Sequence, residues 1–155
     1  MKTSAGILLY RRGEAGLEVL IGHMGGPFWE RKDAGAWSIP KGEMQEGENT
    51  LAVAKREFAE ELGSPPPEEP YLELGEVRQA SGKRVIVFAA QGDLDTESIC
   101  SNSFELEWPR GSGQIQEFPE IDRAAWLSIA QARERLIPAQ ASFVERLEQA
   151  LTGAA

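Results

Sequence analysis

The sequence has a single cysteine and a single histidine, which limits the metal sites it can form. Cys100 alone excludes an intramolecular disulfide. With His23 as the only histidine, a zinc site built from histidines or from a cysteine and histidine cluster is excluded as well. Any metal ion is therefore expected to be held mainly by oxygen atoms.

Positive charge and long hydrophobic runs are also scarce. The chain has 16 Lys and Arg against 25 Asp and Glu, a formal net charge of −9. Such a charge repels nucleic-acid backbones and anionic membranes, so we expect neither duplex nucleic acid nor a membrane as a partner. The apolar run Ile7–Tyr10 is far shorter than the roughly 18 residues of a membrane span and too short for a signal peptide. These absences favour a cytoplasmic protein.

The remaining composition is that of an ordinary globular protein. Of 155 residues, 41% are hydrophobic and 26% are charged. A chain of this length buries about 68 to 70% of its unfolded surface without disulfides. No internal repeat or long linker divides the sequence, so we predict one domain over residues 1–155.

Hydrophobic periodicity predicts strands mixed with helices. Strands are expected at 4–11 and 17–23, joined by a turn at 13–16, and at 71–79, 84–91 and 103–108. Helical spacing predicts a helix over 49–62 that ends at Gly63, and two further helices that begin at Ser128 and after Pro138. Residues 24–35 are expected to form an irregular loop, and residues 109–119 are turn-rich and polar. This order predicts an α+β fold or a three-layer sandwich, with at least five strands in one sheet.

The helix predicted over 49–62 concentrates negative charge. At 100° per residue, Glu57, Glu60 and Glu61 lie within about 100° of one another, beside the apolar stripe of the helix. Like charges at these spacings destabilise a helix, so either the face is simply solvated or a cation compensates for the repulsion. Mg²⁺ prefers oxygen ligands and bridges phosphate oxygens, so it fits this arrangement better than zinc, with Mn²⁺ as a substitute.

The spacing in this region resembles the signature of the Nudix hydrolases. The matching positions are Gly42, Glu48, Arg56, Glu57, Glu60, Glu61 and Gly63. They fall within one continuous segment of 22 residues. The segment departs from the pattern only after Gly63, where Ser64 replaces an aliphatic residue.

The resemblance implies a Nudix-type α/β/α sandwich, in which a mixed sheet lies between helices and the signature forms a loop, a helix and a loop. It implies that the catalytic metal ligands are Glu57, Glu60 and Glu61 with the carbonyl of Gly42, and that Glu48 and Arg56 hold the signature in shape. The implied reaction is Mg²⁺-dependent hydrolysis of a phosphoanhydride bond in a nucleoside diphosphate linked to another group. Charge neutralisation and activation of a bound water would carry that reaction.

Residues outside the signature are candidates for substrate binding. The segment 37–42 resembles the entry to the signature in the diadenosine tetraphosphate and diphosphoinositol polyphosphate branches of the family. Lys41 and Trp37 are therefore substrate-binding candidates. Lys83 and Arg84, at a predicted turn, are candidates for an outer phosphate.

A general base and a nucleobase site are also suggested. Glu120 lies six residues before Trp126, as in the diadenosine tetraphosphate branch, and is the first candidate for the base. Glu117 or a signature glutamate is the alternative. Exposed aromatic side chains at Phe28, Trp29 and Phe118 could sandwich a purine. His23 and Cys100 are expected to be structural, since no acid is evident that would orient the histidine.

The substrate class is narrowed by two departures from family subgroups. The tyrosine found about 17 residues beyond the signature in the diadenosine tetraphosphate branch is missing, and so is the proline found about 15 residues beyond it in ADP-ribose pyrophosphatases. Dinucleoside polyphosphates and (d)NTPs lead as substrates. The alternatives are a non-catalytic nucleotide-binding regulatory domain and an RNA 5′-end pyrophosphohydrolase. The sequence does not define an oligomeric state.

Overall fold

A mixed β-sheet forms the centre of the computed structural model, which describes residues 2–14 and 16–152. Ala15 of the predicted turn therefore lies outside the described residues. The sheet follows the order β3-β2-β1-β6-β5, while β4 pairs with β1 and β9 pairs with β2. The strands are β1 (Thr3–Gly13), β2 (Gly16–Met24), β3 (Trp37–Ser38), β4 (Lys41–Glu43), β5 (Leu72–Arg78), β6 (Arg84–Gln91) and β9 (Ile121–Ser128). β1 and β6 are parallel, and the other pairs are antiparallel.

The first hairpin separates at one end, and residues 37–43, called the strap here, fill the gap. β1 pairs with β2 from Leu9 to the turn, but its first half pairs with β4, and the end of β2 pairs with β3. The Ile7 N–H donates to the Pro40 carbonyl at 3.2 Å. A Cβ at Gly6 would lie 2.4 Å from that carbonyl oxygen, so only glycine allows this close approach.

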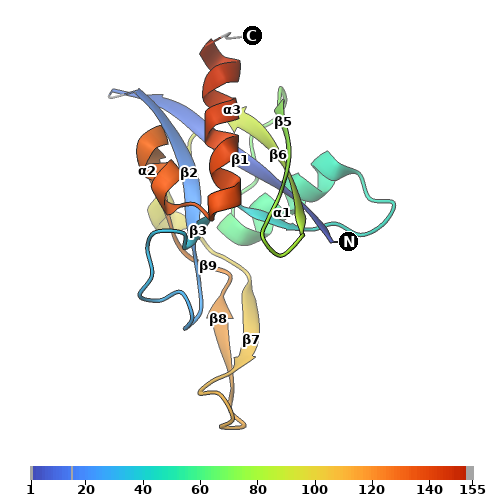
Figure 1. The fold of residues 1–155 in the computed structure, drawn as a ribbon, viewed down its shortest axis with the longest axis vertical. Helices are drawn as coiled ribbons and strands as arrows, with labels where there is room; N and C mark the ends of the chain where they lie inside the picture. Colours follow the sequence, from blue (N-terminus) through green and yellow to red (C-terminus); the bar gives the residue numbers. More distant parts are fainter. Residues whose placement is uncertain (1, 15, 153–155) are drawn as a thin grey trace.

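Helices cover both faces of the sheet. α1 (Thr50–Leu62) lies on one face, and α2 (Ile129–Arg135) and α3 (Ala141–Thr152) lie on the other (Figure 1). Two short 3₁₀ helices, η1 (Thr96–Ser98) and η2 (Pro138–Gln140), complete the helical elements of the described residues. One hydrophobic cluster packs between the sheet and α1, and a second packs beneath α2 and α3. The expected α/β/α sandwich is confirmed.

The helix α1 forms for the reasons that the sequence indicates. The Asn49 side chain accepts a hydrogen bond from the Ala52 N–H at 3.0 Å, and Gly63 ends the helix in the left-handed region at φ 75°. Phe58 and Leu62 are fully buried against the sheet. The apolar stripe therefore fixes the rotation of the helix and thereby the direction of its acidic side.

A separate hairpin differs from the sequence prediction. β7 (Ser103–Glu107) and β8 (Ile115–Pro119) form their own two-stranded sheet, which projects from the body of the molecule (Figure 1). The prediction that 103–108 extends the main sheet was wrong, and the turn-rich stretch 109–119 contains the second strand of the hairpin. Phe104 faces Phe118 across this pair, so the alternating pattern of β7 serves its own hairpin and not the main core.

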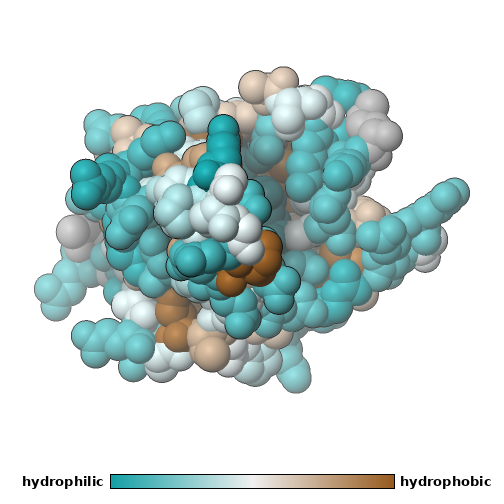
Figure 2. All heavy atoms as spheres, turned by 90° about the horizontal axis from the view of Figure 1, so that it is seen from below, coloured by the Kyte–Doolittle hydropathy of each residue, from teal (hydrophilic) through white to brown (hydrophobic). Residues whose placement is uncertain are grey.

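The surface around this hairpin is mostly hydrophilic. Viewed from below, its hydrophobic atoms form small separate patches (Figure 2). Among the described residues, the exposed large hydrophobic side chains are Phe28 and Ile115. None of the described helices is long and apolar enough to cross a membrane.

The packing of α1 predicts a large difference between two identical substitutions. Phe58→Ala should lower the free energy of unfolding by about 3 to 5 kcal/mol, because it leaves a cavity under the helix. Phe28→Ala, at a side chain that is 49% exposed, should lower it by less than about 1 kcal/mol. Urea denaturation monitored by circular dichroism measures both. Equal losses would contradict the assignment of Phe58 to the core.

Candidate active site

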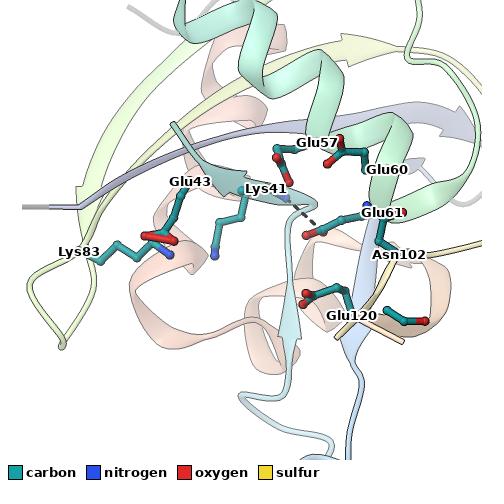
Figure 3. A pocket seen from close by; sticks show the side chains of 10 residues that line it. Lys41, Glu43, Glu57, Glu60, Glu61, Lys83, Asn102 and Glu120 are labelled. Carbon is teal, nitrogen blue, oxygen red and sulfur yellow. Dashed lines mark hydrogen bonds between the residues drawn. The ribbon is translucent and has the colours of Figure 1, made fainter. Parts of the chain in front are cut away.

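A cavity of about 350 Å³ lies where α1 meets the strap (Figure 3). Its walls come from α1, the strap, the turn before β6, the start of β7 and the turn between β8 and β9. The lining residues are Lys41, Gly42, Glu43, Glu57, Glu60, Glu61, Lys83, Asn102, Ser103 and Glu120. Parts of the chain that are distant in sequence thus meet at one polar cavity.

The acidic side of α1 packs directly on the strap. Glu61 Oε1 accepts a hydrogen bond from the Lys41 backbone N–H at 3.3 Å. A Cβ built at Gly42 would lie 1.9 Å from Glu57 Oε1, so no larger residue fits at position 42 without moving that carboxylate. The glycine therefore permits contact between a glutamate side chain and the strap backbone.

An ion pair connects the loop before α1 to the helix itself. The Arg56 guanidinium donates to Glu48 Oε2 at 2.7 Å, while Glu48 Oε1 accepts from the Gln45 N–H at 2.6 Å. Both contacts lower the pKa of Glu48, with the bond from Arg56 as the larger cause. Arg56 also lies 3.6 Å from a carboxylate oxygen of Glu57. This arrangement matches the structural pairing that the signature implies.

Burial disfavours the charged forms of two glutamates at the α1 end of the cavity. Burial raises the pKa of Glu61 from its ordinary value of 4.5 to about 8, although Lys41 opposes the shift. Burial, followed by repulsion from Glu60, also raises the pKa of Glu57. A carboxylate in such a position favours either a proton or a cation.

Positive charge collects at the other end of the cavity. Lys41 is largely withdrawn from water, and this burial, followed by repulsion from Lys83, lowers the pKa of its ammonium group. Figure 3 shows Lys83 beside Glu43 on one side of the cavity, the glutamates of α1 on the other, and Lys41 between them. The cavity thus has a carboxylate end and a lysine end.

The donor set at the carboxylate end fits a hard divalent cation. Glu57, Glu60 and Glu61 offer oxygen ligands from α1, and the backbone of Gly42 lies against Glu57. Within residues 2–14 and 16–152, no three Asp, Glu, His or Cys side chains are already arranged to hold an ion. The fit therefore rests on the chemistry of these donors and on the raised pKa values of Glu57 and Glu61, and coordination would require the side chains to rotate toward a common point.

Two of the predicted substrate contacts lie elsewhere. Trp37 is 3% exposed, and its Nε1 donates to Asp33 at 2.8 Å, so it belongs to the core and not to the cavity. Arg84 donates to both carboxylate oxygens of Glu76, at 2.8 and 2.6 Å, and lines a different surface cleft. Neither residue lines the cavity, whereas Lys41 and Lys83 do.

The predicted base lies at the cavity, whereas the predicted aromatic residues do not form a slot for a nucleobase there. Glu120 lines the cavity, facing α1 from the turn between β8 and β9, whereas Glu117 is exposed on β8 and does not line it. The Phe28 ring meets the Trp108 ring at 5.6 Å between centroids, which leaves no slot for a base between them. Trp29 packs against the core instead.

Some features of this region carry no sequence signal. Asn102 and Ser103 line the cavity only because the projecting hairpin begins beside α1.

The expectation that His23 lacks an orienting acid was wrong. Its Nδ1 lies 2.9 Å from Asp122, and its Nε2 lies 2.7 Å from the Lys32 carbonyl. His23 is fully buried and outside the cavity, so these contacts join β2 to β9 and to the loop after β2.

The protein is an α/β/α sandwich in which an acidic helix packs on a lysine-bearing strap. The NUDIX domain model matches residues 1–147, so the chain belongs to the NUDIX family. This confirms the resemblance to the Nudix hydrolases that the signature indicates. No curated protein sequence matches the chain.

Solved structures share the fold at low sequence identity. The C. elegans Ap4A hydrolase in a binary complex has a TM-score of 0.65 and 20% identity, over 99% of both chains. The NUDIX domain of Shewanella oneidensis NrtR complexed with ADP ribose has a TM-score of 0.63 and 16% identity, over 96% of this chain and 87% of that one. The M. smegmatis Nudix hydrolase RenU has a TM-score of 0.61 and 20% identity, over 99% and 87%. These likenesses establish the fold.

The raised pKa of Glu61 predicts how stability depends on pH without metal. The native state keeps a proton on Glu61 up to about pH 8, which the unfolded chain loses near 4.5, so rising pH destabilises the native state over this window. Glu61→Gln should remove this contribution and gain stability relative to wild type, on the order of 3 kcal/mol by pH 8.

Urea denaturation at several pH values in a chelator measures this effect. Glu148→Gln, at an exposed glutamate of α3, is the matched control and should follow the wild-type curve. A difference between Glu61→Gln and wild type that does not change with pH would refute the assignment.

Proposed function

We propose that this protein is a Mg²⁺-dependent pyrophosphohydrolase that cleaves a phosphoanhydride bond in a nucleoside polyphosphate. The observation that carries the proposal is the division of one cavity into a carboxylate end and a lysine end. Binding of a phosphate chain would use both ends of the cavity. A metal ion bound to the phosphates requires oxygen ligands, and the remaining negative charge of the phosphates requires cations. Membership of the NUDIX family supports this reading.

The proposal gives each residue a role. Glu57, Glu60 and Glu61, with the Gly42 carbonyl, would hold Mg²⁺, which when bound neutralises the diphosphate and lowers the pKa of a water molecule. Glu48 and Arg56 would keep the loop and α1 in register.

Glu120 enters the cavity from a different element than the α1 glutamates, and it is the candidate that accepts a proton from the attacking water. A signature glutamate is the alternative base. Lys41 and Lys83 would bind the phosphates beyond the cleaved bond.

The lysine end favours substrates with more than two phosphates. A diphosphate engaged at the α1 end leaves Lys41 and Lys83 for an outer phosphate, as a dinucleoside polyphosphate or a (d)NTP would supply. The C. elegans protein of the same fold is an Ap4A hydrolase, which agrees with this class. The cavity volume of about 350 Å³ is small for a whole nucleotide, so the nucleoside would lie outside it.

Glu60→Gln should leave folding intact and lower kcat by about three decades, because it removes a charged ligand from the metal. Its side chain is 41% exposed, so little packing is lost. Glu148→Gln makes the same chemical change on another helix and should keep full activity. Near-normal turnover by Glu60→Gln would overturn the metal assignment.

The substrate class is tested with purified protein, Mg²⁺ and a panel of dNTPs, dinucleoside polyphosphates, nucleotide sugars, diphosphoinositols and triphosphorylated RNA. Ion-exchange chromatography identifies the products and the phosphorus attacked. Cleavage of one nucleotide class, absent in Glu60→Gln, is the expected result. Nucleotide binding without cleavage would contradict the proposed enzyme and favour a regulatory domain. Cleavage of RNA 5′ ends alone would contradict the proposed substrate class.

Lys83→Met should raise KM by about tenfold for a substrate with three or more phosphates, since it removes one charged contact to an outer phosphate. The effect should be small for a substrate with only two phosphates. Lys55→Met is the control, because Lys55 lies on α1 over the Tyr71 ring and does not line the cavity. The same KM change for both substrates would contradict the outer-phosphate role.

A further inference from the structure

Gln140, at the end of η2, is a fully buried polar side chain that does not line the cavity. It lies more than sixty residues after the nearest signature position in the sequence. Its amide is nevertheless hydrogen-bonded to two separate segments, and each of these segments carries one of the cavity lysines. The burial of an amide with these partners makes its position well defined.

The first set of bonds holds the strap. Gln140 Oε1 accepts from the backbone N–H of Ile39 at 2.9 Å, and Nε2 donates to Ser38 Oγ at 3.2 Å. Because a backbone N–H can only donate, it determines which end of the amide carries the oxygen. The backbone N–H of Ile137 adds a bond to the Trp37 carbonyl at 2.9 Å. Lys41 follows Ile39 by two residues on this strap.

The second bond holds the turn before β6. Gln140 Nε2 donates to Gln79 Oε1 at 3.1 Å. Gln79 in turn closes the tight turn that contains Lys83: its N–H donates to the Lys83 carbonyl at 2.9 Å, and its carbonyl accepts from the Gly82 N–H at 2.8 Å. One amide therefore links the backbone near Lys41 to the turn of Lys83.

The connection opposes an electrostatic repulsion, because the ammonium groups of Lys41 and Lys83 carry the same charge. Lys41 and Lys83 line the same cavity, and Glu43 is the carboxylate that lies beside them. The strands β4 and β6 both pair with β1, and the Gln140 amide adds a connection between the segments that carry the two lysines, one that needs no bound anion.

We propose that Gln140 is a positioning residue that holds the strap and the 79–83 turn together, so that Lys41 and Lys83 form one anion-binding end and select substrates by the number of their phosphates. The selection rests on the proposed function, whereas the coupling of the two lysine segments does not. Gln140 acts through its neighbours and touches no substrate.

The test uses two variants of similar length and a packing control. Gln140→Met removes all the side-chain bonds, and Gln79→Met removes only the connection to the Lys83 turn at a half-buried position. Val144→Ala loses buried packing on α3 without touching the connection. Circular dichroism establishes that each variant folds. If Gln140→Met does not fold, Gln79→Met carries the test.

Inorganic tripolyphosphate, titrated by calorimetry with and without Mg²⁺, is the probe. Both Met variants should bind it about tenfold more weakly than wild type, and Val144→Ala should bind it normally. In a Lys83→Met background, Gln79→Met should have no further effect, because the two changes act through the same group. Wild-type binding by Gln79→Met, additive effects, or no binding by the wild type would each overturn the inference.

Hydrogen exchange separates this inference from the proposed function. Gln140→Met should speed exchange at the Ile39 amide and in the 79–83 turn, while Val144→Ala should not do so selectively. With an active enzyme, the Met variants should raise KM for triphosphates and leave kcat within about twofold. If the protein hydrolyses nothing but the binding and exchange results hold, only the proposed function fails.

Discussion

The close packing of α1 on the strap is the contact on which the rest of the site depends. Glu57 lies against the backbone of Gly42, and Glu61 accepts a hydrogen bond from the Lys41 backbone N–H. These contacts exist because the first hairpin separates and admits the strap, with Gly6 allowing the close approach of Pro40. An acidic helix thereby meets a lysine-bearing segment at a partly buried cavity.

The electrostatic consequence is a site in which burial acts on charged groups of both signs. Burial disfavours the charged form of Glu61 at one end and of Lys41 at the other. Buried groups of this kind lower stability unless a partner neutralises them. The buried amide of Gln140 connects the two segments that carry the cavity lysines.

Local sequence patterns were sufficient to predict the elements that are defined by residues close together in the sequence. The apolar stripe of α1, its cap at Asn49 and its end at Gly63 predicted the helix, and the glutamate spacing predicted which side chains share one face. The hairpin β7–β8 was missed because its alternation packs Phe104 on Phe118, and a sequence pattern does not show which partner an apolar face will meet. Trp37 and Arg84 were misplaced for the same reason.

By itself, the sequence determined the family, the α/β/α fold and the cluster of acidic residues, because each depends on spacing along one continuous segment or on strong periodicity. Only the tertiary structure decided which residues from other segments reach that cluster. It brought Lys83, Asn102 and Glu120 to the cavity and kept Trp37 and Arg84 out of it. The physical reason is that these positions depend on how strands pair and where a strap enters the sheet, and such long-range contacts leave no periodic trace in the chain.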